Sequence, residues 1–354
     1  MHSTPDRSTR VVRWPARLAA TITTAAAVAL TGCGAGGAQV EQTESGLTRL
    51  VVDYGATANT AQLSLGIRQG IFERHGLEIQ QLPGTGASAN SVALLLNGQI
   101  QLAVGEITAV PAAVAAGFPV QIVASMMADY TSPTGDVFSL VVAGDSDIRS
   151  FADLQGRRVA VNALESIFDL SVLEAVRAAG GDPAAVELVA VPMEDQVAAL
   201  RQGRVDAVNT VQPFAGRLVA DGFRSVGNPV TEALGPRSIS GVLTASQQFV
   251  EQNPDAVGRF VRAWDEATRY ANEHPEEIRA TIAELTGAPP EAVARLPLPW
   301  YVSGVDRRSA EAVTRLMVEH GRLETAPALD AFVWAQAPEA TGLTTPPQHL
   351  QISG

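Results

Sequence analysis

The chain has 354 residues, with 37 acidic residues against 25 basic ones and a formal net charge of −12. Nucleic acid is therefore not an expected partner, because its phosphates attract basic proteins. The single cysteine excludes an intrachain disulfide, and the length is sufficient for two units with a core each.

The first 33 residues have the composition of an export signal. Four arginines precede an apolar run from Leu18 to Leu30, which leads to Thr31, Gly32 and Cys33. Small residues before a cysteine resemble the lipobox of bacterial lipoproteins, which implies cleavage before Cys33 and acylation of its sulfur. The alternative is an ordinary signal peptide or membrane anchor with an incidental cysteine. Loss of residues 1–32 leaves a mature net charge of about −15.

Residues 33–47, rich in Gly, Gln, Thr and Glu, predict a flexible tether. The most apolar later stretch, 102–125, is interrupted by an acidic residue, two prolines and a glycine, so we expect no spanning helix there. The sequence thus predicts an extracytoplasmic protein that an N-terminal lipid holds at the cell membrane.

From residue 47 the chain alternates apolar strands with helical segments, a pattern typical of an α/β fold with parallel strands. The first unit is predicted as strand 50–54, helix 59–72, strand 77–82, helix 91–97, strand 100–104, helix 108–116 and strand 120–125. A second unit repeats this order with a short helix near 150–155, strand 159–161, helix 168–179, strand 186–191, helix 194–202 and strand 205–209.

Two isolated strand-like runs, 137–143 and 239–244, bracket the second unit, and we expect them to be hinge crossings between two lobes. The remaining chain predicts a nearly strand-free tail that packs on the first lobe. Its expected helices are 246–252, 254–273, 275–286, 290–296 and 306–322, with prolines in several first turns.

The segment PGTGASANS, residues 83–91, lies between a predicted strand and a predicted helix. It matches the G-x-G-x-x-G/A pattern, and Glu106 follows at the distance of a ribose-binding acid, which favours a dinucleotide site. An exported protein, however, meets no cytosolic pool of nicotinamide cofactor, and the helix that follows is short. We therefore expect this loop to offer backbone N–H groups to a different ligand.

Four further segments carry a family resemblance. They are Gly66 to Ile79, Gly98 to Gly105, Asp153 to Val161 and Gln212-Pro213-Phe214-Ala215. Together they resemble the solute-binding components of ABC importers for nitrate, sulfonates, taurine and thiamine-pyrimidine precursors, over about residues 50–322. Val211 and Gln212 stand where the family has Trp and Glu, and Gln101 stands where Asp is frequent. These departures bear on the ligand rather than on the fold.

The resemblance implies a two-lobed periplasmic-binding-protein-like fold of type II, with two hinge crossings and the helical C-terminal tail on lobe 1. Lobe 1 is expected to comprise 48–138 and 240–354, and lobe 2 to comprise 139–239. It also implies a monomer without a cofactor that captures a small-molecule solute in the cleft and presents it to permease subunits.

In an open α/β sheet, ligands meet the carboxyl ends of strands and the helix starts that follow. The ligand-binding residues predicted on this basis are Tyr54, Thr57, Asn59, Thr85, Gly86, Ser88, Glu106, Asp129, Tyr130, Glu165, Phe168 and Gln212. The alternative for each acid is a solvated loop position, and the alternative for Asn59 is a helix cap.

Several acids near the expected cleft, without an arginine in the same loops, disfavour an anionic ligand. A neutral or cationic solute fits better, and Tyr54, Tyr130, Phe168 and Trp300 could stack on an aminopyrimidine-like ring. The alternatives are a sulfonate, taurine or nitrate anion bound by the same fold, or a sensor or adhesion lipoprotein. The histidines are scattered and match no catalytic or metal motif, so we expect no catalytic residue and no metal. An enzyme related to thiamine-pyrimidine synthesis remains an alternative on the same scaffold.

Overall fold

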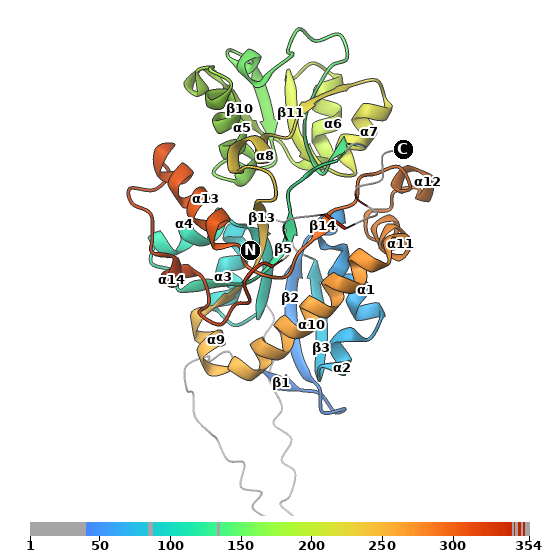
Figure 1. The fold of residues 1–354 in the computed structure, drawn as a ribbon, viewed down its shortest axis with the longest axis vertical. Helices are drawn as coiled ribbons and strands as arrows, with labels where there is room; N and C mark the ends of the chain where they lie inside the picture. Colours follow the sequence, from blue (N-terminus) through green and yellow to red (C-terminus); the bar gives the residue numbers. More distant parts are fainter. Residues whose placement is uncertain are drawn as a thin grey trace, which may run out of the picture. The chain divides into compact units, whose positions relative to one another are not determined.

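The computed structural model describes residues 40–83, 88–132, 135–341, 343, 346–347 and 350. Within them the chain forms two separate mixed sheets with helices on their faces (Figure 1). This arrangement confirms the predicted α/β class. Among these residues, no helix is long and apolar enough to cross a membrane.

The first sheet draws its strands from distant parts of the chain. Its order is β1 (Glu41–Gln42), β2 (Thr48–Tyr54), β4 (Leu102–Glu106), β13 (Ile239–Ser246), β5 (Val120–Ala128) and β14 (Trp300–Tyr301), with β3 (Leu77–Pro83) paired to β2. Strand β2 runs parallel to β3 and β4, whereas β13 is antiparallel to both β4 and β5. The carboxyl ends of β2 and β4 therefore lie at the same edge of the sheet.

The second sheet is built from one continuous stretch of chain. Its order is β10 (Glu187–Ala190), β9 (Arg158–Val161), β11 (Ala207–Val211), β8 (Phe138–Val142) and β12 (Arg224–Gly227). The short strands β6 (Thr131–Ser132) and β7 (Gly135–Asp136) form a separate ribbon before β8. Strands β9, β10 and β11 are parallel, so their carboxyl ends also share one edge.

The predicted hinge crossings at 137–143 and 239–244 are wrong in position. Strand β8 lies inside the second sheet between β11 and β12, and β13 lies inside the first sheet between β4 and β5. Unbroken apolar runs are typical of strands buried on both faces, which explains their composition. The chain passes between the sheets just outside these strands, and there Asp129 N donates to Ser238 O at 2.7 Å while Arg237 N donates to Asp129 O at 2.7 Å.

Helices of the first half cover the first sheet. They are η1 (Ala58–Thr60), α1 (Ala61–Arg68), α2 (Ile71–Arg74), α3 (Ser88–Leu96) and α4 (Ala109–Ala115). The single helix predicted over 59–72 is divided at Gly70, whose φ of 63° is left-handed and ends α1. Gly66 on α1 lets two side chains approach closely, since a Cβ there would lie 2.7 Å from Ala267 Cβ and 2.9 Å from Phe72 Cε2.

The second sheet carries a hydrophobic cluster on each face. Its helices are η2 (Phe151–Leu154), α5 (Ile167–Ala178), η3 (Pro183–Ala185), α6 (Met193–Arg201), α7 (Phe214–Ala220) and α8 (Pro229–Leu234). Residues of η2 and α5 form one cluster, and residues of α6 and α7 form the other. Covered on both faces, this sheet offers only its edges and strand ends to other parts of the protein.

The C-terminal region is helical, as predicted. It comprises α9 (Gln247–Gln252), α10 (Pro254–Glu273), α11 (Pro275–Thr286), α12 (Pro290–Val293), α13 (Arg307–Glu319) and α14 (Leu329–Phe332). Helix α10 packs on α1 and α2 (Figure 1), and the indole of its fully buried Trp264 donates to Ser125 O at 2.7 Å. Helix α13 contacts β13 of the first sheet and also α5 and α8 beside the second sheet. The tail therefore packs on the first sheet but reaches the second as well.

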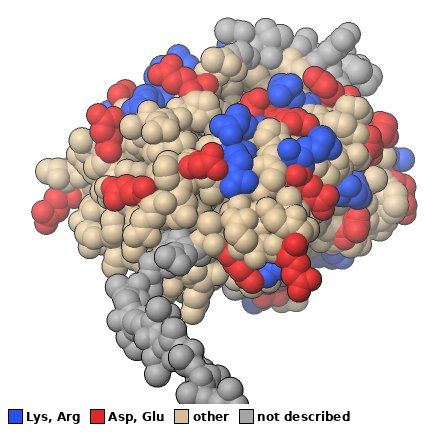
Figure 2. All heavy atoms as spheres, turned by 90° about the horizontal axis from the view of Figure 1, so that it is seen from below, with Lys and Arg blue, Asp and Glu red and all other residues tan. Residues whose placement is uncertain are grey.

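Basic and acidic side chains are interspersed on the face of the molecule seen in Figure 2. All of the basic residues in the chain are arginines. Many of them pair with nearby acids, as Arg49 does with Glu78 at 2.7 Å and Arg74 does with Glu266 at 2.8 Å. Such exposed pairs add little to stability individually, because water and salt screen them.

Candidate functional site

The end of β4 meets the start of α5, so that a carboxylate of the first sheet reaches a helix of the second. Glu106, the last residue of β4, accepts a hydrogen bond from Ile167 N at 2.9 Å. Its other oxygen accepts from Asn162 Nδ2 at 3.3 Å. The first N–H groups of a helix have no partner within the helix, and the helix dipole favours a negative group beside them. Glu106, a residue of the first sheet, therefore provides the acceptor for an N–H group at the start of α5.

The carboxyl of Glu106 is tuned to change charge near neutrality. Burial raises its pKa from 4.5 to about 7, although the hydrogen bonds from Ile167 and Asn162 lower it, and nearby Asp169 raises it further. The residue as a whole is half-buried. A carboxyl of this kind can present either an acceptor or a donor to a bound molecule.

The turn before α5 is locked by a capping box. Ser166 accepts from Phe168 N at 3.2 Å, while Asp169 accepts from Ser166 N at 2.9 Å and from Glu165 N at 2.7 Å. Glu165 itself has a left-handed φ of 59° and an exposed side chain. This geometry follows from the Ser-x-x-Asp spacing. It directs the Ile167 amide toward Glu106.

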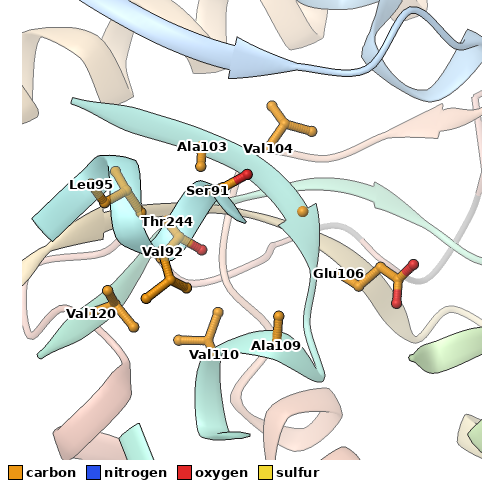
Figure 3. Close-up of a pocket in the computed structure, with 11 residues that line it drawn as sticks. Ser91, Val92, Leu95, Ala103, Val104, Glu106, Ala109, Val110, Val120 and Thr244 are labelled. Atoms are coloured by element: carbon orange, nitrogen blue, oxygen red, sulfur yellow. The ribbon is translucent and has the colours of Figure 1, made fainter. Parts of the chain in front are cut away.

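A small cavity lies behind Glu106, between the first sheet and helices α3 and α4. It measures about 20 Å³ and is lined by Ser91, Val92, Leu95, Ala103, Val104, Gly105, Glu106, Ala109, Val110, Val120 and Thr244. Figure 3 shows the carboxyl of Glu106 directed away from the aliphatic side chains of this cavity. A space of this size holds about one water molecule. This cavity is therefore too small for an organic solute.

Strand β2 ends in a second group of polar atoms. Ser91 Oγ on α3 donates to Asp53 Oδ2 at 2.5 Å, which ties the helix to the strand. Within the described part of the chain, Asp53 Oδ1 and Asn59 Oδ1 are both buried and have no hydrogen-bond partner. Tyr54 is half-buried at the end of β2. Buried acceptors without donors are uncommon, and an ordered water or a bound ligand can supply the missing donor.

The helix-cap alternative for Asn59 is wrong, because Thr57 occupies that position. Thr57 begins η1 and forms a reciprocal capping box with Thr60, whose Oγ1 accepts from Thr57 N at 3.3 Å. The structure therefore gives Thr57 a local role and leaves the amide oxygen of Asn59 unused.

Asp129 and Tyr130 lie where the chain leaves the first sheet. Asp129 is buried, and it accepts from Ser240 Oγ at 3.2 Å and Ser238 Oγ at 3.4 Å. Burial raises the pKa of Asp129 to about 7 despite these two bonds. Tyr130 donates to a backbone oxygen, Leu298 O, at 2.6 Å, and its ring lies edge-on to Trp300. These side chains brace the connecting segments, and a contact with solute remains a prediction for them.

Phe168 and Gln212 are both engaged by the second sheet. Phe168 is buried edge-on against Phe138, with 5.5 Å between the ring centres. Gln212 is buried; its Nε2 donates to Asp136 O at 3.1 Å, and its Oε1 accepts from Gly216 N at 3.0 Å. The nitrogen and the oxygen of the Gln212 side-chain amide are thus both bonded within the protein, at the wall of a separate hollow of about 420 Å³ between α7 and α12.

Four of the predicted residues cannot be placed in full. Thr85, Gly86 and Cys33 lie outside the described residues, and Ser88 begins α3 without a described side chain. Among the described residues, no group of three or more His, Cys, Asp and Glu side chains could hold a metal ion.

Comparison with known proteins assigns the chain to a family. Residues 57–278 match the family described as NMT1/THI5 like. The chain belongs to the NMT1/THI5-like family. It is 29% identical over 210 residues to the taurine-binding periplasmic protein of Escherichia coli K12, a match that spans 57% of this chain and 62% of that protein. The chain therefore covers less than two thirds of the length of this curated relative.

Solved structures share the fold of this NMT1/THI5-like chain. The periplasmic aliphatic sulphonate binding protein SsuA of Escherichia coli superposes with a TM-score of 0.66 at 20% identity, covering 83% of this chain and 94% of SsuA. The desulfurization enzyme DSZB superposes with a TM-score of 0.58 at 19% identity, covering 81% of this chain and 96% of the enzyme. At these identities the likeness concerns the fold alone.

The structure also shows which other residues build the α5 side of the Glu106 contact. Asn162 and Ser166 belong to the loop 162–168, which the sequence placed across the expected cleft, whereas Asp169 and its partner Arg322, at 2.8 Å, were missed. The Ser-x-x-Asp spacing was a usable signal for the capping box. Arg322 carried no signal, because it lies 153 positions from its partner.

Proposed function

We propose that this protein is the solute-binding component of an ABC importer, held outside the cell membrane by a lipid on Cys33. The observation that carries the proposal is the contact of Glu106 with Ile167 N at 2.9 Å, which brings the strand ends of both sheets to one place. Family membership and the taurine-binding relative support a transport role. A solute between the sheets would favour the closed arrangement by binding it more tightly than the open one.

The solute is neutral or cationic in this proposal, with hydrogen-bond donors as in an aminopyrimidine. Glu106 already occupies the donors at the start of α5 that an anion would use. The buried acceptors Asp53 Oδ1 and Asn59 Oδ1 need donors. An anionic group about 4 Å from an ionised Glu106 would be disfavoured by about 4 kcal/mol at an effective dielectric of 20. Protonation of Glu106 would reduce that cost, and the sulphonate-binding and taurine-binding relatives support the anionic alternative.

A thermal-shift screen of the mature protein separates these ligand classes. Aminopyrimidines, alkylamines, taurine, an aliphatic sulfonate and nitrate are tested at pH 8, where Glu106 is mostly ionised. A ligand present at 100 times its Kd stabilises the folded protein by about 2.7 kcal/mol. We expect stabilisation by the amines or aminopyrimidines. Stabilisation by the sulfonate, taurine or nitrate alone would contradict the neutral or cationic solute and support the anionic alternative. Mass spectrometry of each bound compound tests for turnover, and we expect the compound to be unchanged.

Glu106→Gln tests the site directly. Loss of a hydrogen bond to an ionised group costs about 1.5–3 kcal/mol, so we expect Kd for a cationic solute to rise about 10- to 150-fold. Glu324→Gln is the matched control, because it makes the same charge change on an exposed residue. Equal affinity of both variants and the parent for the solute would show that Glu106 does not belong to the binding site.

The lipid anchor has its own test. We expect the Cys33→Ala variant to move from the membrane fraction to the extracytoplasmic soluble fraction, because it lacks the thiol that is acylated. Membrane retention of this variant would contradict lipid anchoring while leaving the solute-binding proposal intact.

A further inference from the structure

The segment that follows α13 binds the first turns of α5 through two pairs of charged or polar side chains. Arg322 donates to both oxygens of Asp169, at 3.0 and 2.8 Å, and the two side chains are only 16% and 2% exposed. His320 Nε2 lies 3.1 Å from Glu174 Oε2, with side chains that are 9% and 8% exposed. We refer to His320 and Arg322 as the C-terminal clamp.

The clamp differs from the ion pairs on the surface. A guanidinium that binds both oxygens of a carboxylate fixes the direction of the contact as well as its distance. When such a pair is shielded from water, removal of one partner strongly destabilises the protein. By contrast, Arg315 and Glu319, neighbours on α13, are 3.7 Å apart and 64% and 45% exposed. Unlike the Arg315–Glu319 pair, the clamp can hold two parts of the fold in a defined position.

Helix α13 is fixed to both sheets. Near its start, Ser309 Oγ accepts from Ile239 N of β13 at 2.9 Å, so this end belongs with the first sheet. Just beyond its other end, the clamp binds α5 of the second sheet. Helix α13 therefore connects the sheets, in addition to the Glu106 contact and the two segments where the chain passes between them.

The clamp also leads to Glu106 through a short series of contacts. Asp169, which Arg322 holds, accepts from the amides of Glu165 and Ser166. The next amide along this turn, Ile167 N, binds Glu106. A shift of Asp169 must therefore move the donor that reaches Glu106.

We propose that Arg322 is a positioning residue of the candidate site: it holds Asp169, and with it the first turn of α5, where Ile167 and Asn162 reach Glu106. The C-terminal tail thereby sets how firmly the two sheets are held together at the site. This inference rests on the proposed function only in taking Glu106 as part of the solute site.

The charged groups around this contact predict the sign of the effect. Asp169 raises the pKa of Glu106, whereas the hydrogen bond from Ile167 lowers it. Arg322 neutralises Asp169 and supports the turn, so loss of Arg322 should raise the pKa of Glu106 on both grounds. The other charged groups nearby form their own cluster, in which α5 contributes Glu174 and Arg177 while α13 and its end contribute Glu319 and His320.

The test compares Arg322→Gln with the parent by NMR, without any solute. The pKa of Glu106 is followed through its side-chain carboxyl carbon, which is assigned with the Glu106→Gln variant, and the exchange of the Ile167 amide is followed in the same samples. We expect Arg322→Gln to raise the pKa of Glu106 and to speed Ile167 exchange on the order of tenfold or more. The pKa of Asp129 should stay as in the parent, which separates a local effect from general loosening.

Two further variants complete the test. Arg315→Gln, on the exposed side of the same helix, should leave both readouts at parent values. Arg322→Lys keeps the charge but loses the two-pronged geometry, so it should give an exchange rate between those of the parent and Arg322→Gln. A folded Arg322→Gln protein with parental values for both readouts would overturn the proposal. If Arg322→Gln does not fold, parental exchange in Arg322→Lys would overturn it as well. Since no readout needs a solute, failure of the solute screen leaves this result interpretable.

Discussion

Asp129→Asn should stabilise the protein at alkaline pH. Burial raises the pKa of the folded carboxyl from 3.8 to about 7, and only the hydroxyls of Ser238 and Ser240 oppose this. A difference of about 3 pH units between the unfolded and folded pKa corresponds to about 4 kcal/mol. Asparagine has the same shape and can still accept from one hydroxyl while donating to the other. It removes the cost of burying a charge.

The sign follows from proton uptake. Between pH 3.8 and about 7 the folded protein holds a proton on Asp129 that the unfolded chain has lost, so the stability of the parent falls as pH rises through this range. The gain in free energy of unfolding from Asp129→Asn should therefore grow by about 3 kcal/mol between pH 5 and pH 8. Urea denaturation of variant and parent at the two pH values measures this difference directly.

Asp206→Asn provides the contrast. Its side-chain hydrogen bond with Arg158 lowers the pKa of Asp206 below 3.8, so the carboxylate is ionised in the folded protein at both pH values. Its removal should destabilise the protein equally at pH 5 and pH 8. An Asp129→Asn effect that is likewise independent of pH would refute the argument that a buried, high-pKa carboxyl limits stability.

Two packing predictions accompany this one. Gly66→Ala should destabilise the protein by about 1–3 kcal/mol, because its Cβ would lie 2.7 Å from Ala267 Cβ, whereas Gly55→Ala should have little effect, since no described atom lies within 4 Å of a Cβ there. Trp264→Ala should cost about 3–5 kcal/mol, because the side chain is fully buried, whereas Phe118→Ala, at a residue 47% exposed, should cost much less. Urea midpoints measure both pairs, and equal losses within either pair would contradict the packing account.

Local patterns in the sequence predicted where helices and strands lie better than they predicted which strands pair with one another. The helix expected over 254–273 matches α10, because a proline in the first turn and a strong helical period both mark it. The apolar run of β13 was recognisable as a strand. Its place between β4 and β5 was not, because pairing joins residues more than a hundred positions apart and leaves no local trace.

The same difference between local and distant features applies to the candidate site. Glu106 could be singled out because it follows a strand whose end should open on the ligand. The loop 162–168 could be placed across the cleft, but its bonds to Glu106 could not be predicted, since Ile167 contributes only a backbone amide and Asn162 lies 56 positions from Glu106. Gln212 was expected to face the solute, but its amide is bonded to Asp136 and Gly216, contacts that depend on how α7 begins.

The two sheets differ in how much of the chain must be synthesised before all of their strands are present. All strands of the second sheet lie between residues 138 and 227, whereas the first sheet needs β13 and β14, which end at residues 246 and 301. Pairing over such separations is slow, because a long loop must close before any contact forms. During synthesis, the middle of the polypeptide can fold first, while β4 and β5 still lack the strand that lies between them, β13. In that interval the open edges of β4 and β5 are exposed to aggregation.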